Sequence, residues 1–234
     1  VAALAAAILL GKREGYGSEE LRPHNLPMTL LGAGLLWFGW FGFNAGSALS
    51  AGSLAGSAFV ATHVAGTTGA LSWIGMEWRT TGKATTLGGA SGAIAGLATV
   101  TPAAGFVGPI SAAFIGILAG VGCYLGIRAK NRFGYDDSLD VVGIHGIGGV
   151  MGLLVTGFLA SAAINPGGAD GLLFGNPAQL GVQCIAVVVT IVYTFVITYI
   201  LLKILDKIFG LRVDQRDERS GLDITQHEET AYNM

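Results

Sequence analysis

Charged side chains are scarce in this chain of 234 residues, where Asp, Glu, Lys and Arg together make up only 12% of the sequence. Hydrophobic residues reach 52% and the mean hydropathy is +0.61, so the chain is far more apolar than an ordinary water-soluble domain. The net charge is only −2 and no long basic stretch occurs, which argues against a nucleic-acid-binding protein. The lack of charge therefore predicts a protein embedded in a lipid bilayer.

Cysteine is also rare. Cys123 and Cys184 both fall within apolar runs, where a thiol usually packs as a small hydrophobic group. This placement implies neither a disulfide nor a metal site, and we expect no cofactor. Glycine, in contrast, is abundant at 38 residues. Each interior glycine would cost a water-soluble helix roughly 1 kcal/mol, whereas in lipid small residues let helices approach closely.

Apolar segments alternate with polar loops along the whole chain. The first, at residues 1–10, is too short to cross a bilayer, which takes roughly 20 residues. Its positive charges follow the apolar run instead of preceding it, unlike those of a signal peptide, so we expect a truncated helix and a fragment of a longer protein. Six further segments are predicted to span, of which the third is short: 26–49, 56–78, 86–102, 107–130, 140–163 and 178–206.

The basic residues predict the topology of these spans. Cytoplasmic loops collect Lys and Arg, and here all 13 basic residues fall at alternate loops. The loops around 50–55, 103–106 and 164–177 carry none. We therefore expect the C-terminal tail to be cytoplasmic and the 164–177 loop to be external. The basic residues are Lys12, Arg13, Arg22, Arg79, Lys83, Arg128, Lys130, Arg132, Lys203, Lys207, Arg212, Arg216 and Arg219.

Glycines recur every fourth residue in several of these segments, which indicates that the helices pack backbone to backbone. The series Gly88, Gly92 and Gly96 is longer than chance would easily produce in a glycine-rich chain. Shorter examples are the pairs Gly116 and Gly120, Gly122 and Gly126, and Gly148 and Gly152.

His145 is the most informative single residue, because it lies in an otherwise apolar spanning segment. Ionisable groups within a membrane are costly and tend to mark pathways. Burial favours the neutral imidazole, which can donate a hydrogen bond from one nitrogen and accept one at the other. That chemistry suits the passage of a small polar molecule or a proton. A histidine that simply bonds to the carbonyl of a neighbouring helix is the alternative, and composition does not decide between them.

Trp40, Phe43 and Ser47 follow one another at helical spacing, which places all three on one face of the first full span. A cation could lie against the aromatic rings while the hydroxyl accepts a hydrogen bond. Ordinary packing or an interfacial aromatic belt would produce the same stripe. For His63, also within an apolar span, we favour ordinary packing.

Asp140 begins the segment that carries His145, and we expect it to cap that helix, with a proton-relay role as the alternative. His145 lies five residues further on, only about 7.5 Å into the helix at the standard rise. A position in the middle of a pore would then require a vestibule that dips into the membrane from the cytoplasm.

Long ordered motifs make the chain resemble the ammonium transporter family, of the microbial and plant type, over almost its whole length. The motifs are Pro23-His24-Asn25-Leu26-Pro27, Trp40-Phe41-Gly42-Phe43-Asn44-Ala45-Gly46-Ser47, Gly89-Ala90-Ser91-Gly92-Ala93-Ile94-Ala95-Gly96-Leu97, Thr101-Pro102, Asp140, His145-Gly146, Gly210-Leu211-Arg212-Val213, Gly221-Leu222-Asp223 and Ala231-Tyr232-Asn233.

This resemblance implies an all-α polytopic membrane bundle, namely a fragment of an eleven-helix fold whose two halves are inverted repeats. The chain would run from the end of helix five through helix eleven. Residues 1–210 would form the partial transmembrane domain and residues 211–234 the cytoplasmic tail. The resemblance also implies a homotrimer in the plasma membrane.

The resemblance assigns roles to individual residues. Trp40 and Ser47 would recruit ammonium externally, Phe43 would be one of two stacked gate phenylalanines, and His145 would be the second of a pair of pore histidines. Asp140 would cap or support the pore helix. The first histidine, the companion phenylalanine and an acidic residue near the recruitment site would lie in the missing N-terminal part. The regulatory tail, which would contact a PII-type signal protein, includes Arg212, Gly221, Leu222, Asp223, His227 and Tyr232.

The implied function is the transport of ammonium, which would lose its proton near the gate and cross an apolar pore largely as ammonia. An alternative is an ammonium sensor that signals through its cytoplasmic tail. An intramembrane hydrolase that pairs His145 with a hydroxyl such as that of Ser47 would need both within hydrogen-bond reach. The predicted topology separates these two residues, so we expect no enzyme.

Overall fold

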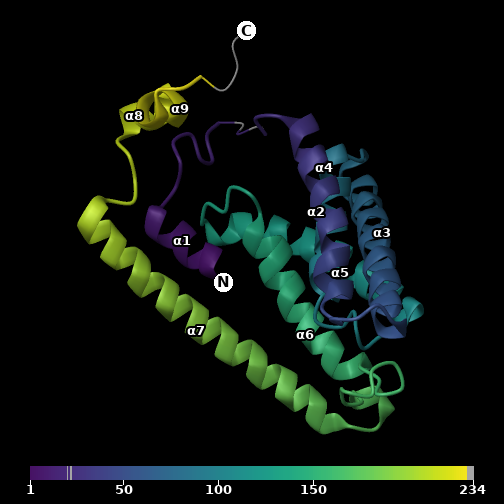
Figure 1. Ribbon diagram of the computed structural model, residues 1–234. Coiled ribbons are helices and arrows are strands. Elements are labelled where there is room, and N and C mark those ends of the chain that lie inside the picture. Colours follow the sequence, from purple (N-terminus) through teal and green to yellow (C-terminus); the bar gives the residue numbers. More distant parts are fainter. Residues whose placement is uncertain (20, 22, 231–234) are drawn as a thin grey trace.

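The computed structural model describes residues 1–19, 21 and 23–230, and within them it contains helices, turns and loops but no strand (Figure 1). This confirms the all-α fold class. The elements are α1 (Ala2–Leu10), α2 (Leu26–Gly46), α3 (Ser53–Thr81), α4 (Thr86–Val100), α5 (Pro109–Phe133), the π-helix η1 (Val142–Gly146), α6 (Ile147–Leu159), the 3₁₀ helix η2 (Leu172–Phe174), α7 (Pro177–Phe209), α8 (Gln215–Ser220) and α9 (Leu222–His227).

Local sequence signals explain where several helices begin and end. Asn25 caps α2 by accepting a hydrogen bond from the N–H of Met28, and Thr85 caps α4 in the same way through the N–H of Gly88. Gly82 and Gly134 end α3 and α5 in the left-handed conformation that glycine adopts easily.

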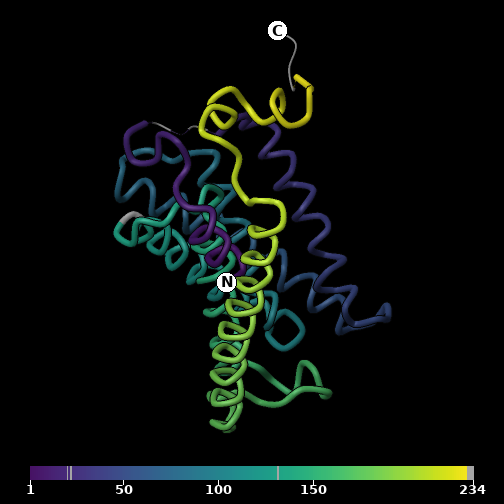
Figure 2. Tube along the Cα trace, turned by 90° about the vertical axis from the view of Figure 1, so that its left-hand side faces the viewer, coloured from purple at the N-terminus to yellow at the C-terminus, as the bar shows by residue number. Residues whose placement is uncertain are grey.

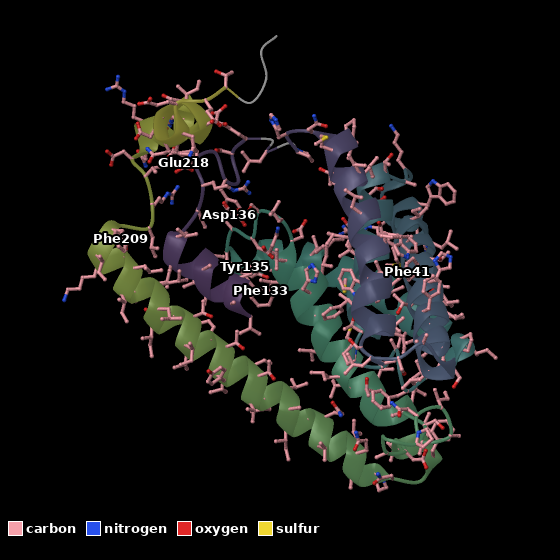
Figure 3. The ribbon with its side chains drawn as sticks, in the orientation of Figure 1. Phe41, Phe133, Tyr135, Asp136, Phe209 and Glu218 are labelled. Atoms are coloured by element: carbon pink, nitrogen blue, oxygen red, sulfur yellow. The ribbon has the colours of Figure 1, made fainter. Side chains whose placement is uncertain are left out.

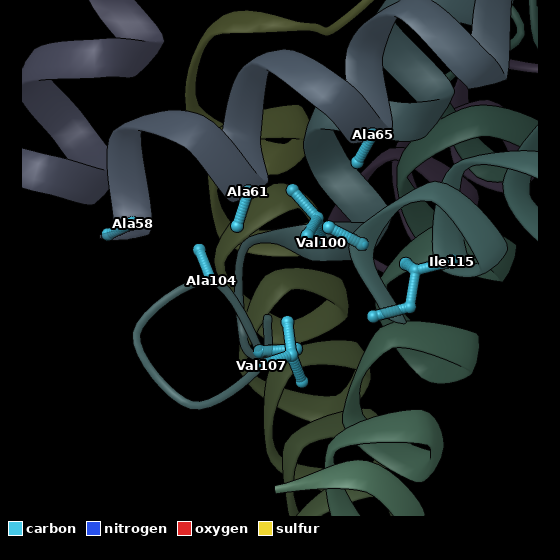
Figure 4. Close-up of a cluster of buried hydrophobic side chains, with 9 residues drawn as sticks. Ala58, Ala61, Ala65, Val100, Ala104, Val107 and Ile115 are labelled. Carbon is cyan, nitrogen blue, oxygen red and sulfur yellow. The ribbon is translucent and has the colours of Figure 1, made fainter. Parts of the chain in front are cut away.

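Helices α3, α4 and α5 form the packed part of the molecule, which we call the three-helix cluster. Its core consists mainly of alanine and valine, together with residues of the loop after α4 (Figure 4). The backbones approach so closely that a Cβ added at Gly96 would lie 2.1 Å from the carbonyl oxygen of Ala65. The glycine spacing therefore predicted backbone contact correctly here. The buried core residues are Ala58, Ala61, Ala65, Val100, Ala103, Ala104, Val107, Ala112 and Ile115.

Helix α7 lies apart from that cluster along one side of the molecule and contacts α1 and α6 (Figures 1 and 2). None of its residues is buried, although it is the most apolar of the candidate spans. It has 33 residues, enough to cross a bilayer with a substantial tilt.

Among the described residues, four helical segments are long and apolar enough to cross a membrane: Leu26–Gly46, Pro109–Lys130, Val142–Leu159 and Pro177–Phe209. Helix α3 is long but carries more polar residues. Helix α4 has 15 residues and covers only about 22 Å at the standard rise, which is less than the thickness of a bilayer core. The loop that follows it is partly buried against the neighbouring helices.

Polar loops meet at one end of the molecule. Arg13 forms an ion pair of 2.8 Å with Asp136, and Arg219 forms one of 2.9 Å with Glu14. Glu218 of α8 accepts a hydrogen bond from the N–H of Glu14 as well (Figure 3). Within residues 211–230 the tail thus forms two short helices, of which α8 docks on the loop after α1. The meeting of these loops agrees with the pattern of basic residues, and the side of the membrane stays a prediction.

Candidate functional site

The helix that carries His145 is held at its start by a different carboxylate from the one expected. Asp137 accepts hydrogen bonds from the N–H of Val141 at 3.1 Å and of Val142 at 2.7 Å. Asp140 has a φ of 55° and its side chain forms an ion pair of 2.5 Å with Lys130. The capping hydrogen bonds therefore come from Asp137, three residues earlier, and not from the side chain of Asp140. Asp140 instead ties the helix start to α5, and a role as a support of the helix, the alternative to capping, stays a prediction.

His145 itself lies in the π-helical turn η1. The N–H of Ile147 reaches back five residues to the carbonyl of Val142, one residue further than in an α-helix. Such turns are rare and often occur at functional sites. The loop just before η1 lies nearer the centre of the molecule than α8 does, as the labels of Asp136 and Glu218 show (Figure 3). Because the helix starts nearer the centre of the molecule, a residue close to its beginning can lie well away from the end where α8 lies.

The imidazole of His145 faces an open groove of about 370 Å³ between α4, α6 and α7. The groove is mostly apolar, with hydroxyls contributed by Thr101, Thr190 and Thr194. The indole of Trp40 stands parallel to the imidazole, with an interplanar angle of 3° and 6.5 Å between ring centroids. Trp40 Nε1 donates to Thr101 Oγ1 at 2.8 Å, which fixes the indole.

A second, more polar pocket of about 320 Å³ lies at the C-terminal end of α2. Phe43, Asn44 and Ser47 line it from α2, and the loops after α4 and α6 contribute Phe106 and Asn165. The hydroxyl of Ser47 donates to the carbonyl of Phe43 at 2.5 Å, so its oxygen lone pairs are available to accept. We call this pocket the mouth.

Thr101 is the residue that joins the two cavities. It lines both the mouth and the groove, and it donates its own hydrogen to the carbonyl of Leu97 at 2.7 Å. Because the hydroxyl hydrogen of Thr101 is already used in this bond, the lone pairs of its oxygen face the cavities and Trp40. The sequence analysis noted Thr101 only as part of a motif, since a threonine in an apolar segment gives no signal of its own.

The structure does not bring Trp40 and Ser47 into one site, as the sequence analysis expected. The contacts of Trp40 are with His145 and Thr101. Ser47 lies two turns further along α2, about 10 Å at the standard rise, and lines the mouth with Phe43. The two residues therefore share a face of α2 but lie at different levels along it, Ser47 in the mouth and Trp40 beside His145. Phe43, 63% exposed, borders both the mouth and an apolar depression on the side of α2.

His63 lies elsewhere, on the exposed face of α3. Its ring packs against Trp37 at 5.6 Å and Phe41 at 5.9 Å between centroids. It lines neither the groove nor the mouth, which agrees with the packing role favoured by the sequence.

The tail residues form contacts of their own. Arg212 pairs with Glu218 at 2.8 Å and donates to the carbonyl of Leu10 at 3.0 Å. Gly221, with a φ of 103°, separates α8 from α9. Leu222 and Asp223 begin α9 and His227 ends it, whereas Tyr232 lies outside the described residues. A regulatory role for these residues stays a prediction.

Comparison with known proteins gives a family. The model of the Ammonium Transporter Family matches residues 1–232. An ammonium transporter of Bacillus subtilis is 47% identical over 99% of this chain and 57% of its own length. The ammonium transporter Amt1 of Archaeoglobus fulgidus is 49% identical over 99% of this chain and 58% of its own.

Solved structures agree. The crystal structure of Saccharomyces cerevisiae Mep2 has a TM-score of 0.84 at 36% identity, covering 92% of this chain and 52% of that one. A structure named Sensor Amt Protein has a TM-score of 0.84 at 30% identity, covering 96% and 56%. The chain thus spans about half the length of the curated relatives it matches. Those relatives are named transporters, not enzymes.

Proposed function

The chain belongs to the ammonium transporter family, and from this we propose that the whole protein moves ammonium or ammonia across a membrane through a path in which the mouth leads to the groove at His145. The observation that carries the proposal is the imidazole of His145, exposed to an apolar groove and parallel to the ring of Trp40. An ionisable ring at membrane depth that faces a conduit is more readily explained by transport than by packing.

The mouth is the proposed place of recruitment. An ammonium ion has four donors and one positive charge, so it is matched by lone pairs and aromatic faces. Ser47 offers the first and Phe43 the second, and both line the same pocket. Water can still reach this pocket, so a proton released there has an acceptor. Trp40, which the resemblance assigned to recruitment, is better suited to line the path below the gate at Phe43.

Passage through the groove is proposed to occur in the uncharged form. The walls supply few polar groups, so a charged species would lose its hydration without replacement. A neutral imidazole can accept a hydrogen bond from ammonia or donate one to its lone pair. K⁺ and Na⁺ cannot release a proton and so cannot lower their cost of desolvation, which accounts for selectivity.

The test is His145→Ala in the full-length protein reconstituted in liposomes. We expect the ammonium-dependent current or pH change to fall by about tenfold, or discrimination against K⁺ to be lost, because the path loses its only imidazole in the described part of the groove. His63→Ala is the matched control, since it removes an imidazole that packs on aromatic rings outside the path. Unchanged flux and selectivity in His145→Ala would sink the pore role.

A sensor that signals through its tail is the second candidate. What favours it is the docking of α8 on the loop after α1, through the ion pair of Arg219 with Glu14 and the hydrogen bond from the N–H of Glu14 to Glu218, together with the likeness to the structure named Sensor Amt Protein. The same docked tail could meet a PII-type protein on the cytoplasmic face of a plasma-membrane trimer. Deleting residues 211–234 would separate the two functions, since flux that persists without signalling identifies a transporter with a regulatory tail.

A further inference from the structure

The sulfur of Cys123, on α5, lies against the backbone of the helix that carries His145. The thiol donates to the carbonyl of Ile144, with 3.5 Å between sulfur and oxygen. A Cβ added at Gly148, about one turn further along, would lie 3.5 Å from the same sulfur. The thiol therefore meets the helix between residues 144 and 148 and donates a hydrogen bond to the first of these two residues.

This contact coincides with the π-helical turn. The N–H of Ile147 reaches back to Val142, so η1 accommodates one more residue than an α-helical turn would. The carbonyl that accepts from the thiol, that of Ile144, belongs to this turn. His145 lies inside the distorted turn, one residue after the carbonyl that Cys123 holds.

The helix needs this extra residue because both of its ends are fixed. At the start, Asp137 caps the first turn and Lys130 bonds to Asp140. Beyond the turn, Gly152 lies against α4 so closely that an added Cβ would be 2.2 Å from the carbonyl oxygen of Thr99. Removing one residue from the turn would rotate one end against the other by about 100°. The ring of His145 would then leave its parallel position beside Trp40.

We propose that Cys123 is a positioning residue for His145: its thiol donates a hydrogen bond to the carbonyl of Ile144, and so holds the π-turn that directs the imidazole into the groove. This inference rests on the proposed function. A fully buried cysteine is ordinarily a small hydrophobic group, and Cys123 does pack with Trp73, Ala95 and Tyr124. Packing alone, however, would require only its volume, whereas the contact with Ile144 requires a hydrogen-bond donor.

Three substitutions of Cys123 separate volume from hydrogen bonding. Cys123→Ser keeps the hydrogen-bond donor, Cys123→Ala removes it and leaves a small void, and Cys123→Val removes it while filling the space. Cys184→Ala is the matched control, because Cys184 is exposed on α7 and touches no part of the turn. Each is measured in the full-length protein in liposomes for ammonium flux and K⁺ leak, and in detergent for thermal unfolding.

We expect Cys123→Ala and Cys123→Val to lower ammonium flux about fivefold relative to K⁺ leak, the factor that corresponds to one ordinary hydrogen bond. Cys123→Ser and Cys184→Ala stay within about twofold of the unmodified protein. Equal flux ratios in the Ser and Val variants, whether both normal or both impaired, overturn the positioning role. If the Ala or Val variant does not fold, a structure of the Ser variant tests the positioning role instead. Loss of the π-turn in a variant that still carries a hydroxyl would also overturn that role.

The two proposals fail in different ways. An unmodified protein that carries no ammonium sinks the proposed function. Ammonium flux that depends on His145 but is the same with Val or Ser at position 123 sinks only the role of Cys123.

Discussion

The three-helix cluster and α7 are both apolar, yet one is packed backbone to backbone and the other has no buried residue. In the cluster, a Cβ at Gly116 would lie 2.4 Å from the carbonyl oxygen of Ala65. On α7, a Cβ at Gly181 would meet nothing within 4 Å among the described residues. Between these two regions, small residues mark the packed helices, whereas the most apolar helix is the least packed. Helix α2 differs, because Cβ atoms added at its glycines would meet nothing within 4 Å among the described residues.

The physical reason is the solvent. In water, a long run of Val, Ile and Leu would be driven into a core, because its burial removes apolar surface from water. In lipid, that drive between helices disappears, and association depends on how closely backbones can approach. Hydropathy therefore predicts that α7 lies in the membrane, and glycine spacing predicts which helices pack together.

The largest effect is expected from a substitution that forces the helices of the three-helix cluster apart. Gly96→Leu would place a side chain where the carbonyl of Ala65 already lies, so α3 and α4 must separate. We expect a loss of about 3 kcal/mol or more of stability, at the upper end for overpacked sites. Thermal unfolding in detergent, followed by the monodispersity of the protein, measures it. Gly181→Leu on α7 is the control and should change little, and an equal loss there would erase the distinction between the two regions.

Particular residues show what the sequence could and could not predict. The fold class and the apolar spans followed from hydropathy, and close helix packing followed from glycine spacing. His145 stood out as an ionisable group in an apolar segment, and its role in a conduit stays a prediction. The cap at Asp137 did not follow from the sequence, because three aspartates precede the helix and only the coordinates show which one reaches the free N–H groups. Trp40 was grouped with Ser47 because helical periodicity fixes the face of a residue but not the depth at which its partners lie. The hydrogen bond from Cys123 to Ile144 is a contact between helices, which no local pattern encodes.

A second difference between the regions is how they respond to acid. The cluster is joined mainly by backbone contacts, although the carboxylate of Glu77 on α3 also accepts hydrogen bonds from Thr85 at the start of α4. The α1 and tail side is joined to the α5–α6 loop by charge, chiefly through Arg13 and the carboxylate of Asp136, whose side chain is 1% exposed. The hydrogen bond from Arg13 holds the pKa of Asp136 below its ordinary value of 3.8. The contribution of this pair is therefore present above about pH 4 and is lost as the pH falls toward the lowered pKa.

Acid should therefore loosen the contacts of the α1 and tail side and leave the three-helix cluster intact. Between pH 7 and pH 3, hydrogen exchange of residues 11–19 and of α8 should rise, while that of α3 and α4 stays slow. Arg13→Met should produce the same pattern at pH 7 and cost about 2 kcal/mol, because it leaves the carboxylate of Asp136 buried without its cation. Arg216→Met, at an exposed position of α8, is the control of equal charge change. Uniform exchange across both regions at low pH would show that charge does not distinguish them.

The smallest predicted change is a gain in stability, at a buried hydroxyl of the three-helix cluster. Thr99 is fully buried in α4, and its hydroxyl has no hydrogen-bond partner among the described residues. Thr99→Val keeps the branched shape and removes the uncompensated polar atom, so it should stabilise the protein by about 1 kcal/mol. Thr99→Ser retains the hydroxyl and loses the methyl group, so it should destabilise by about 1 kcal/mol. If close packing holds the cluster together, as its glycine contacts indicate, the methyl group of Thr99 contributes to stability and its hydroxyl does not. The valine variant should then be more stable than the serine variant. The opposite order of stability would mean that a polar contact, and not close approach of the helices, fixes α4 in its place.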